Sequence, residues 1–199
     1  MKVIIFIVFT TLSITCFGQE VAIPDYRGDK ESFKKIKDKI LRKELATFTI
    51  EGSNGNKPSL ELKQVPLIKS DQRYSLFQKD SFQVIITTGT FNKSKHKIQY
   101  VDKYVVKIDN KPFWGTDGGL PTRTINSVYI IIGKDTISIP TTKMNDLYNP
   151  NLFITNIYFS RDRKRLYIDM INSDGAGGYE VTWIIQDKKY SRRVIGYGF

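Results

Sequence analysis

The C-terminal quarter of the chain contains four β-rich runs separated by short turns, and this pattern constrains the fold more than any other. The runs are Phe153–Phe159, Arg165–Asn172, Tyr179–Gln186 and Tyr190–Tyr197. Pairing Met170 with Val181 as antiparallel neighbours gathers apolar residues on one face: Leu166, Ile168, Trp183 and Ile185. The other face then carries mixed pairs: Asp169 with Thr182, Tyr167 with Ile184, and Arg165 with Gln186. One apolar and one mixed face predict an antiparallel meander with Trp183 in the core.

The residues before this meander also favour strands. Further β-rich runs occupy Thr47–Glu51, Leu60–Ile68, Phe82–Phe91, Ile98–Ile108, Arg123–Ile132 and Thr136–Ile139. Because Pro66 has no backbone N–H to donate, its run is expected at a sheet edge or a bulge. The last two runs flank Gly133, Lys134 and Asp135 and predict a tight hairpin. Residues 141–150 predict a helical turn that stops at Pro150.

A single amphipathic helix is predicted over residues 30–46. Apolar residues recur there at three- and four-residue spacing: Phe33, Ile36, Ile40, Leu41 and Leu45. Asp29 is suited to cap the N-terminus of this helix, and lysines and arginines fill its other faces. A basic amphipathic helix can lie on an anionic membrane surface, but we expect this one to cover one side of a sheet.

Together these elements predict a mainly β fold. It would be an antiparallel sheet meander or sandwich, or a partly open barrel, with one N-terminal amphipathic helix packed on it. No fixed-period repeat and no long linker divides the chain, so residues 19–199 are expected to form a single, mostly β domain. The 31 Lys and Arg against 20 Asp and Glu give a net charge of +11. Such a charge allows peripheral contact with an anionic surface.

The first 18 residues predict a signal peptide. Lys2 precedes a short apolar run, Val3–Phe9, and the apolar character fades toward Cys16 and Gly18, two small residues that suit cleavage after Gly18. The run is shorter than the ~20 residues that a membrane-spanning helix needs, and no later stretch is long enough. The mature chain is therefore expected in the periplasm, at the cell surface or outside the cell, without a transmembrane span.

Cys16 permits a different interpretation of the N-terminus. A cysteine at the end of an apolar leader can be the lipid-modified first residue of a bacterial lipoprotein. That signal has a small residue directly before the cysteine and an apolar one three places before it, where this chain has Thr15 and Ser13. We therefore favour simple cleavage after Gly18. Either route leaves no thiol for a disulfide, a metal ligand or a nucleophile.

Two glycine-rich turns hold the candidate site residues. Gly115–Gly119 contains Asp117, and Ser173–Tyr179 contains Asp174. Because glycine lets a ligand approach the backbone closely, these carboxylates could serve glycoside hydrolysis or bind calcium. Two aromatic residues adjoin the turns and could stack on a sugar or anchor a protein partner: Trp114 and Tyr179. Neither turn has a phosphate, dinucleotide or EF-hand spacing, so plain connections between strands are the simpler interpretation.

No metal or cofactor is expected. His96 is the only histidine and lies in a lysine-rich turn, where positive neighbours disfavour a Ser-His-Asp arrangement. A zinc site of clustered His and Cys is excluded by count. Basic residues gather at two hairpin tips together with Tyr167 and Tyr190: Arg161, Arg163, Lys164 and Arg165, then Lys188, Lys189, Arg192 and Arg193. Such tips suit a polyanion, but no nucleic-acid module is present and export argues against a nucleic-acid partner.

Three stretches of the C-terminal half resemble a group of known sequences. They are Asp146–Asn151, Asn172–Trp183 and the ending Arg193–Phe199. They resemble small, uncharacterised exported proteins of Bacteroidota, over roughly residues 113–199. The resemblance implies a Gram-negative envelope setting, but it implies no activity and supplies no functional residues.

Two functions follow from these observations. The first is an exported, non-catalytic binding protein of the bacterial envelope whose partner is an envelope or extracellular protein; an inhibitor or immunity-type factor is one form. The second is a carboxylate-based hydrolase acting on a glycan or peptidoglycan. The missing thiol and the single histidine favour the first, whereas the 20 acidic residues keep the second open.

The cleavage site can be tested by intact-mass measurement of the protein isolated from its native host. We expect a mature chain that begins at Gln19, because the apolar run ends at a pair of small residues two apart. A chain that begins at a lipid-modified Cys16 would contradict this and assign the protein to the lipoprotein route.

Overall fold

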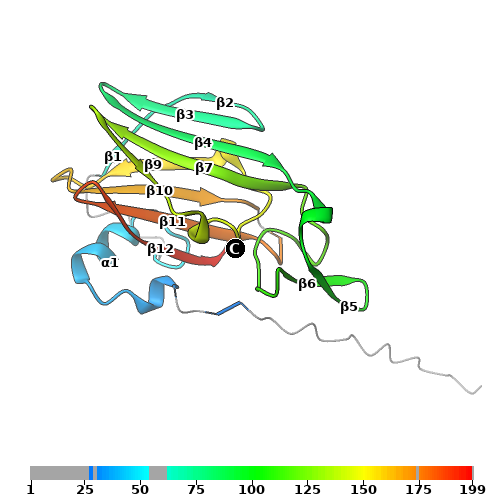
Figure 1. Cartoon of the computed structure of the whole chain (residues 1–199). Helices are drawn as coiled ribbons and strands as arrows, with labels where there is room; N and C mark the ends of the chain where they lie inside the picture. The colour runs from blue at the N-terminus through cyan, green and yellow to red at the C-terminus, as the bar shows by residue number, and fades with distance from the viewer. Residues whose placement is uncertain (1–26, 29–30, 54–61, 174, 199) are drawn as a thin grey trace, which may run out of the picture.

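Two antiparallel five-stranded sheets stacked face to face form the body of the protein (Figure 1). The structure is a computed structural model that describes residues 27–28, 31–53, 62–173 and 175–198. Sheet A contains, in order across the sheet, β1 (Lys63–Gln64), β9 (Thr155–Phe159), β10 (Arg165–Ile171), β11 (Tyr179–Gln186) and β12 (Lys189–Tyr197). Sheet B contains β2 (Leu67–Ser70), β3 (Tyr74–Lys79), β4 (Phe82–Thr90), β7 (Arg123–Ile132) and β8 (Asp135–Ser138). The expected signal peptide, with Cys16, lies outside the described residues.

An apolar core lies between the two sheets. Alternate residues of β4 and β7 point inward from sheet B and meet alternate residues of β10 and β11 from sheet A, as period-2 strands require. Trp183 is fully buried near the centre, and its indole N–H donates to the carbonyl oxygen of Lys143 at 3.0 Å. The predicted mainly β fold is therefore confirmed, as a sandwich with a helix rather than a barrel.

The register predicted for the C-terminal meander is also confirmed. Met170 pairs with Val181, Ile168 with Trp183 and Leu166 with Ile185. The mixed pairs lie on the opposite face, where Asp169 faces Thr182. The hairpin of β7 and β8 around Gly133 is likewise present, and a short 3-10 helix, Thr141–Lys143, begins the predicted helical turn.

The chain passes from one sheet to the other at Val65 and Pro66. β1 pairs with β9 in sheet A, whereas β2 pairs with β3 in sheet B. The Val65 N–H donates to Ile157 O at 2.9 Å, and the Pro66 carbonyl accepts from the Gln78 N–H at 3.1 Å. Pro66 thus stands at a crossing where the strand ladder needs no donor. The run predicted as one edge strand is two short strands in different sheets.

The N-terminal helix is shorter than predicted. A 3-10 turn, Phe33–Lys35, precedes α1 (Lys39–Leu45), and extended backbone separates them. The Asp38 carboxylate accepts the N–H groups of Ile40 and Leu41 and so starts the helix at this point. The expected N-cap, Asp29, lies outside the described residues. No helix in the described residues has the length and apolarity needed to cross a membrane.

The segment from the 3-10 turn to α1 covers the outer face of sheet A. Phe33, Ile36, Leu41 and Leu45 pack on Tyr167, Ile184 and Val194. This confirms the expected packing on a sheet, with one correction. Ile40 is 61% exposed, because the helix starts late and turns this position away from the sheet.

Two further strand predictions differ from the structure, and one strand was not predicted. Thr47–Glu51 forms turns instead of a strand, because the Thr49 N–H and hydroxyl both bond the carbonyl of Leu45 and continue the helix end. Ile98–Ile108 is a separate hairpin of β5 (Ile98–Val101) and β6 (Tyr104–Ile108), turning at Asp102 with φ 52°. The unpredicted strand is β3, which pairs with β4 across a turn that contains no glycine.

Removing side-chain volume at two neighbouring helix positions tests this packing. We expect Leu41→Ala to lower the free energy of unfolding by about 2–4 kcal/mol, because it leaves a cavity against sheet A. Ile40→Ala should change it by less than about 0.5 kcal/mol, because the side chain is mostly in solvent. Urea denaturation of both variants provides the measurement. Equal effects at the two positions would contradict the described orientation of α1.

Candidate functional site

The two glycine turns lie against each other and are joined by hydrogen bonds. The Gly115 N–H donates to Gly177 O at 2.8 Å, and the Gly177 N–H donates to the Asp117 carboxylate. A Cβ atom at Gly177 would lie 1.7 Å from the carbonyl oxygen of Thr116, so only glycine allows this approach. The Asp117 carboxylate therefore has a structural role in the turn contact. Asp174 lies outside the described residues.

Trp114 and Tyr179 belong to the core, which differs from the binding role expected of them. Tyr179 is fully buried, with its hydroxyl 3.8 Å from the sulfur of Met170. Trp114 is 6% exposed, lies edge to face with Tyr197, and carries the Arg27 guanidinium 4.6 Å from its ring centre. Both rings are packed in the core between the sheets, so neither offers a stacking surface to a sugar.

His96 is held in its turn by two contacts. Its ring stacks on Phe91 with 4.7 Å between centroids, and Nδ1 lies 2.7 Å from the Asp109 carboxylate. The contact with His96 lowers the pKa of Asp109. The described residues contain no cluster of three or more His, Cys, Asp or Glu arranged to hold a metal ion. His96 thus fastens the loop before β5 to the loop after β6.

The cations of the two basic hairpin tips do not all face the solvent. Arg165 turns toward the N-terminal segment, where its guanidinium bonds the Glu44 carboxylate at 2.7 and 3.0 Å. Arg193 is also buried and bonds Asp146 through two nitrogens, each at 2.7 Å, and Glu31 at 2.7 Å. Tyr167 is fully buried as well. Two of the eight cations in the polyanion surface expected from the sequence, Arg165 and Arg193, therefore belong to internal ion pairs.

Two carboxyl groups are buried on the outer face of sheet A. Asp169 is 2% exposed and accepts the hydroxyl of Thr182, and burial raises the pKa of Asp169 to about 7. Glu180 is 5% exposed and accepts the Ile50 N–H at 2.7 Å. Burial, together with the nearby Asp169 charge, raises the pKa of Glu180 to about 8. Neither group lines the pocket described next.

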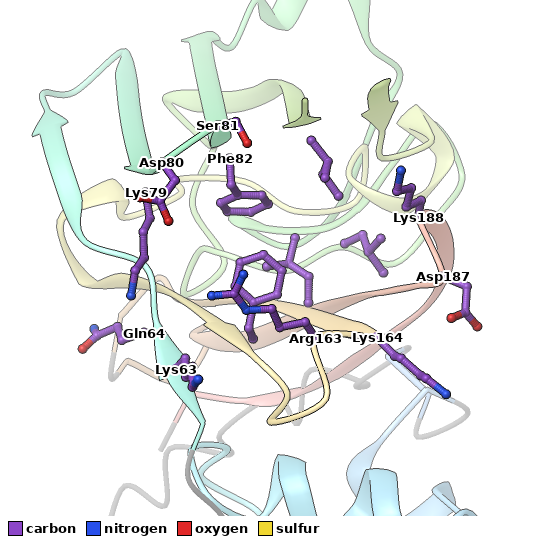
Figure 2. Close-up of a pocket in the computed structure, with 14 residues that line it drawn as sticks. Lys63, Gln64, Lys79, Asp80, Ser81, Phe82, Arg163, Lys164, Asp187 and Lys188 are labelled. Carbon is purple, nitrogen blue, oxygen red and sulfur yellow. The ribbon is translucent and has the colours of Figure 1, made fainter. Parts of the chain in front are cut away.

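A pocket of about 510 Å³ opens at the end of the sandwich where the β3–β4, β9–β10 and β11–β12 turns meet (Figure 2). Its floor is the edge of the core: Phe82, Ile132, Phe159, Leu166 and Ile185. Phe82 of sheet B and Phe159 of sheet A meet edge to face, with 4.6 Å between centroids. The space thus lies between the two sheets. Its volume falls within the range of small-molecule sites, which is roughly 300–1,000 Å³.

The rim of this pocket is basic. Its cations are Lys63 on β1, Lys79 at the end of β3, Arg163 and Lys164 in the β9–β10 turn, and Lys188 in the β11–β12 turn. Lys188 forms an exposed ion pair with Asp135 at 2.7 Å. The side chains of the other four form no ion pair or hydrogen bond with any residue that the structure describes. Two acids, Asp80 and Asp187, complete the charged rim.

Local turn chemistry places these rim residues. Asp80, Arg163, Asp187 and Lys188 all have φ between 49° and 60°, the left-handed conformation that tight turns require. Asp162 stiffens the β9–β10 turn by accepting the Ser160 hydroxyl and the Lys164 N–H. The Arg163 guanidinium is left at the mouth. The basic tips in the sequence pointed to part of this rim, but no sequence signal singled out Lys63 or Lys79.

No known protein family, no curated protein and no solved structure matches this chain. The pocket lining is therefore the basis for assigning a function. It contains one hydroxyl group, on Ser81, but no histidine or cysteine. The apolar floor and the basic rim together are suited to binding a ligand.

The buried carboxyl groups make stability depend on pH. Folding raises the pKa values of Asp169 and Glu180 from their ordinary values of 3.8 and 4.5. The folded state thus keeps protons that the unfolded chain has lost, so their contribution is most favourable below about pH 4 and weakens as pH rises toward 8. The expected slope is about 1.4 kcal/mol per pH unit for each group.

Asp169→Asn tests this, because it keeps the shape and removes the titration. Urea unfolding at pH 5 and pH 8 should show a smaller loss of stability for Asp169→Asn than for the wild type. Asp102→Asn, in an exposed turn, serves as the control and should follow the wild type. An unchanged pH difference in Asp169→Asn would mean that Asp169 is ionised in the folded state.

Proposed function

We propose that this chain is an exported, non-catalytic binding protein and that its ligand site is the pocket at the end of the sandwich. The observation that carries the proposal is the pocket itself: about 510 Å³ of space with a floor made from the core of both sheets. A small ligand seated there would bury most of its surface, as ligands of binding proteins do.

The shape of the site favours a small molecule over a protein surface. A stable protein partner covers about 800 Å² on each side and needs a broad, mostly flat contact. The floor residues instead lie inside the sandwich, and Leu166 and Ile185 are each only 2% exposed. Recognition of an envelope or extracellular protein, expected from the sequence, stays a prediction for another surface of the molecule.

No observation favours the alternative hydrolase. Its two acids were Asp117 and Asp174. The Asp117 carboxylate accepts the backbone N–H of Gly177 and so holds two turns together. Asp174 lies outside the described residues, and the pocket is lined by neither of these acids.

A larger side chain in the pocket should weaken the binding of an apolar ligand. The uncharged apolar fluorophore N-phenyl-1-naphthylamine should bind the wild type saturably, with rising emission as it enters an apolar site. Ile132→Trp places a larger ring in the mouth and should weaken this binding by at least about tenfold. Ile132 is only partly buried, so the added volume can extend into the pocket and not into the core.

The neighbouring residue provides the control. Ile131 lies on the same strand but does not line the pocket, because consecutive strand residues face opposite sides of the sheet. Ile131→Trp should bind the fluorophore like the wild type, and thermal unfolding should show that both variants are folded. Absence of saturable binding to the wild type, or equal loss in both variants, would reject the pocket as the site.

A further inference from the structure

We infer that the ligand of this pocket is a single-chain amphiphile with an anionic head group. Its alkyl tail would lie on the apolar floor, and its carboxylate or phosphate would be bound by the rim cations. The inference rests on the proposed function and specifies the chemical class of the ligand. It is carried by the arrangement of an apolar floor beneath five cations, four of which have no partner among the described residues.

The charge of the rim excludes a cationic ligand and disfavours a neutral one. Five of the fourteen lining residues are basic and two are acidic, so the rim has an excess of three positive charges. Like charges gathered around an apolar opening repel one another, and an anion relieves this repulsion.

Arg163 is the best placed head-group ligand. Figure 2 shows its side chain across the pocket mouth, with Lys63 and Lys79 toward one side and Lys164 and Lys188 toward the other. A guanidinium presents two parallel N–H groups that match a carboxylate or a phosphate. Figure 2 also shows Asp187 directed away from the pocket, whereas Asp80 lies next to Lys79. The acids therefore leave the Arg163 side of the mouth positive.

The apolar floor accounts for the tail. Its five side chains come from five strands of the two sheets, β4, β7, β9, β10 and β11, and all of them border the space below the cations. A polyanion such as nucleic acid would need an extended groove that follows its backbone. A compact pocket of about 510 Å³ with cations at its rim instead fits one chain end, with its charge at the mouth.

Calorimetric titration with ligands of one chain length and different head groups tests this inference. The ligands are dodecanoate, dodecyl phosphate, dodecyl maltoside and dodecyltrimethylammonium, each below its micelle concentration at pH 7. Both anions should bind at least about tenfold more tightly than the neutral and cationic ligands. Shortening the anions to ten and eight carbons should weaken binding by about fourfold for each methylene removed. The anion that binds more tightly identifies the head group as a carboxylate or a phosphate.

Variants then test separately whether the ligand class and the binding site are correct. Arg163→Gln and Lys79→Gln should weaken both anions by about tenfold and leave the neutral fluorophore unaffected. Lys95→Gln removes an exposed cation outside the pocket and should change neither. If neutral and anionic ligands bind equally while the fluorophore still binds, the anionic class is wrong and the binding site stands. If none binds, the proposed function fails as well. Binding to anionic vesicles but not to monomeric amphiphiles would also overturn the inference.

Discussion

Sheet A is buried on both faces, and most other features of the structure follow from this constraint. Its central strands β10 and β11 have almost no exposed residue, because sheet B covers one face and the N-terminal segment covers the other. Polar side chains on these strands consequently need partners away from water. Glu44 on α1 meets Arg165 and Tyr167 on β10, and Asp169 meets Thr182. The short N-terminal helix is therefore part of the fold and not an appendage.

The fold was predictable where turns are short and alternation is regular. The pairing of Met170 with Val181 followed from one apolar face and a short connection, and it fixed the register of the last strands. Sheet B was harder to predict from the sequence, because β3 turns into β4 at Asp80 and Ser81 without the glycine that usually marks a hairpin. The length of the helix depended on the side chain of Asp38, a local capping contact that periodicity does not report.

The candidate site was mostly hidden from sequence reasoning, for a physical reason. Its lining comes from residues far apart in the chain, between Lys63 and Lys188, and only the stacking of two sheets brings them together. The basic tips were visible, but their cations have different roles: Arg163 stands in the turn at the mouth, whereas Arg165 begins β10 and pairs with Glu44. The glycine turns were predicted as sites because glycine allows another group to approach the backbone closely. Here the approaching group is the chain's own backbone.

The two sheets are joined differently on the two sides of the pocket, and the crossing at Val65 and Pro66 forms one of these sides. There, adjacent residues are hydrogen-bonded to opposite sheets, so the sheets cannot separate at that edge. Across the mouth, the contact between the sheets includes the exposed ion pair of Lys188 and Asp135, an interaction that solvent and salt weaken. Rising ionic strength should therefore weaken the contact between Lys188 and Asp135 and leave the hydrogen bonds at the crossing intact.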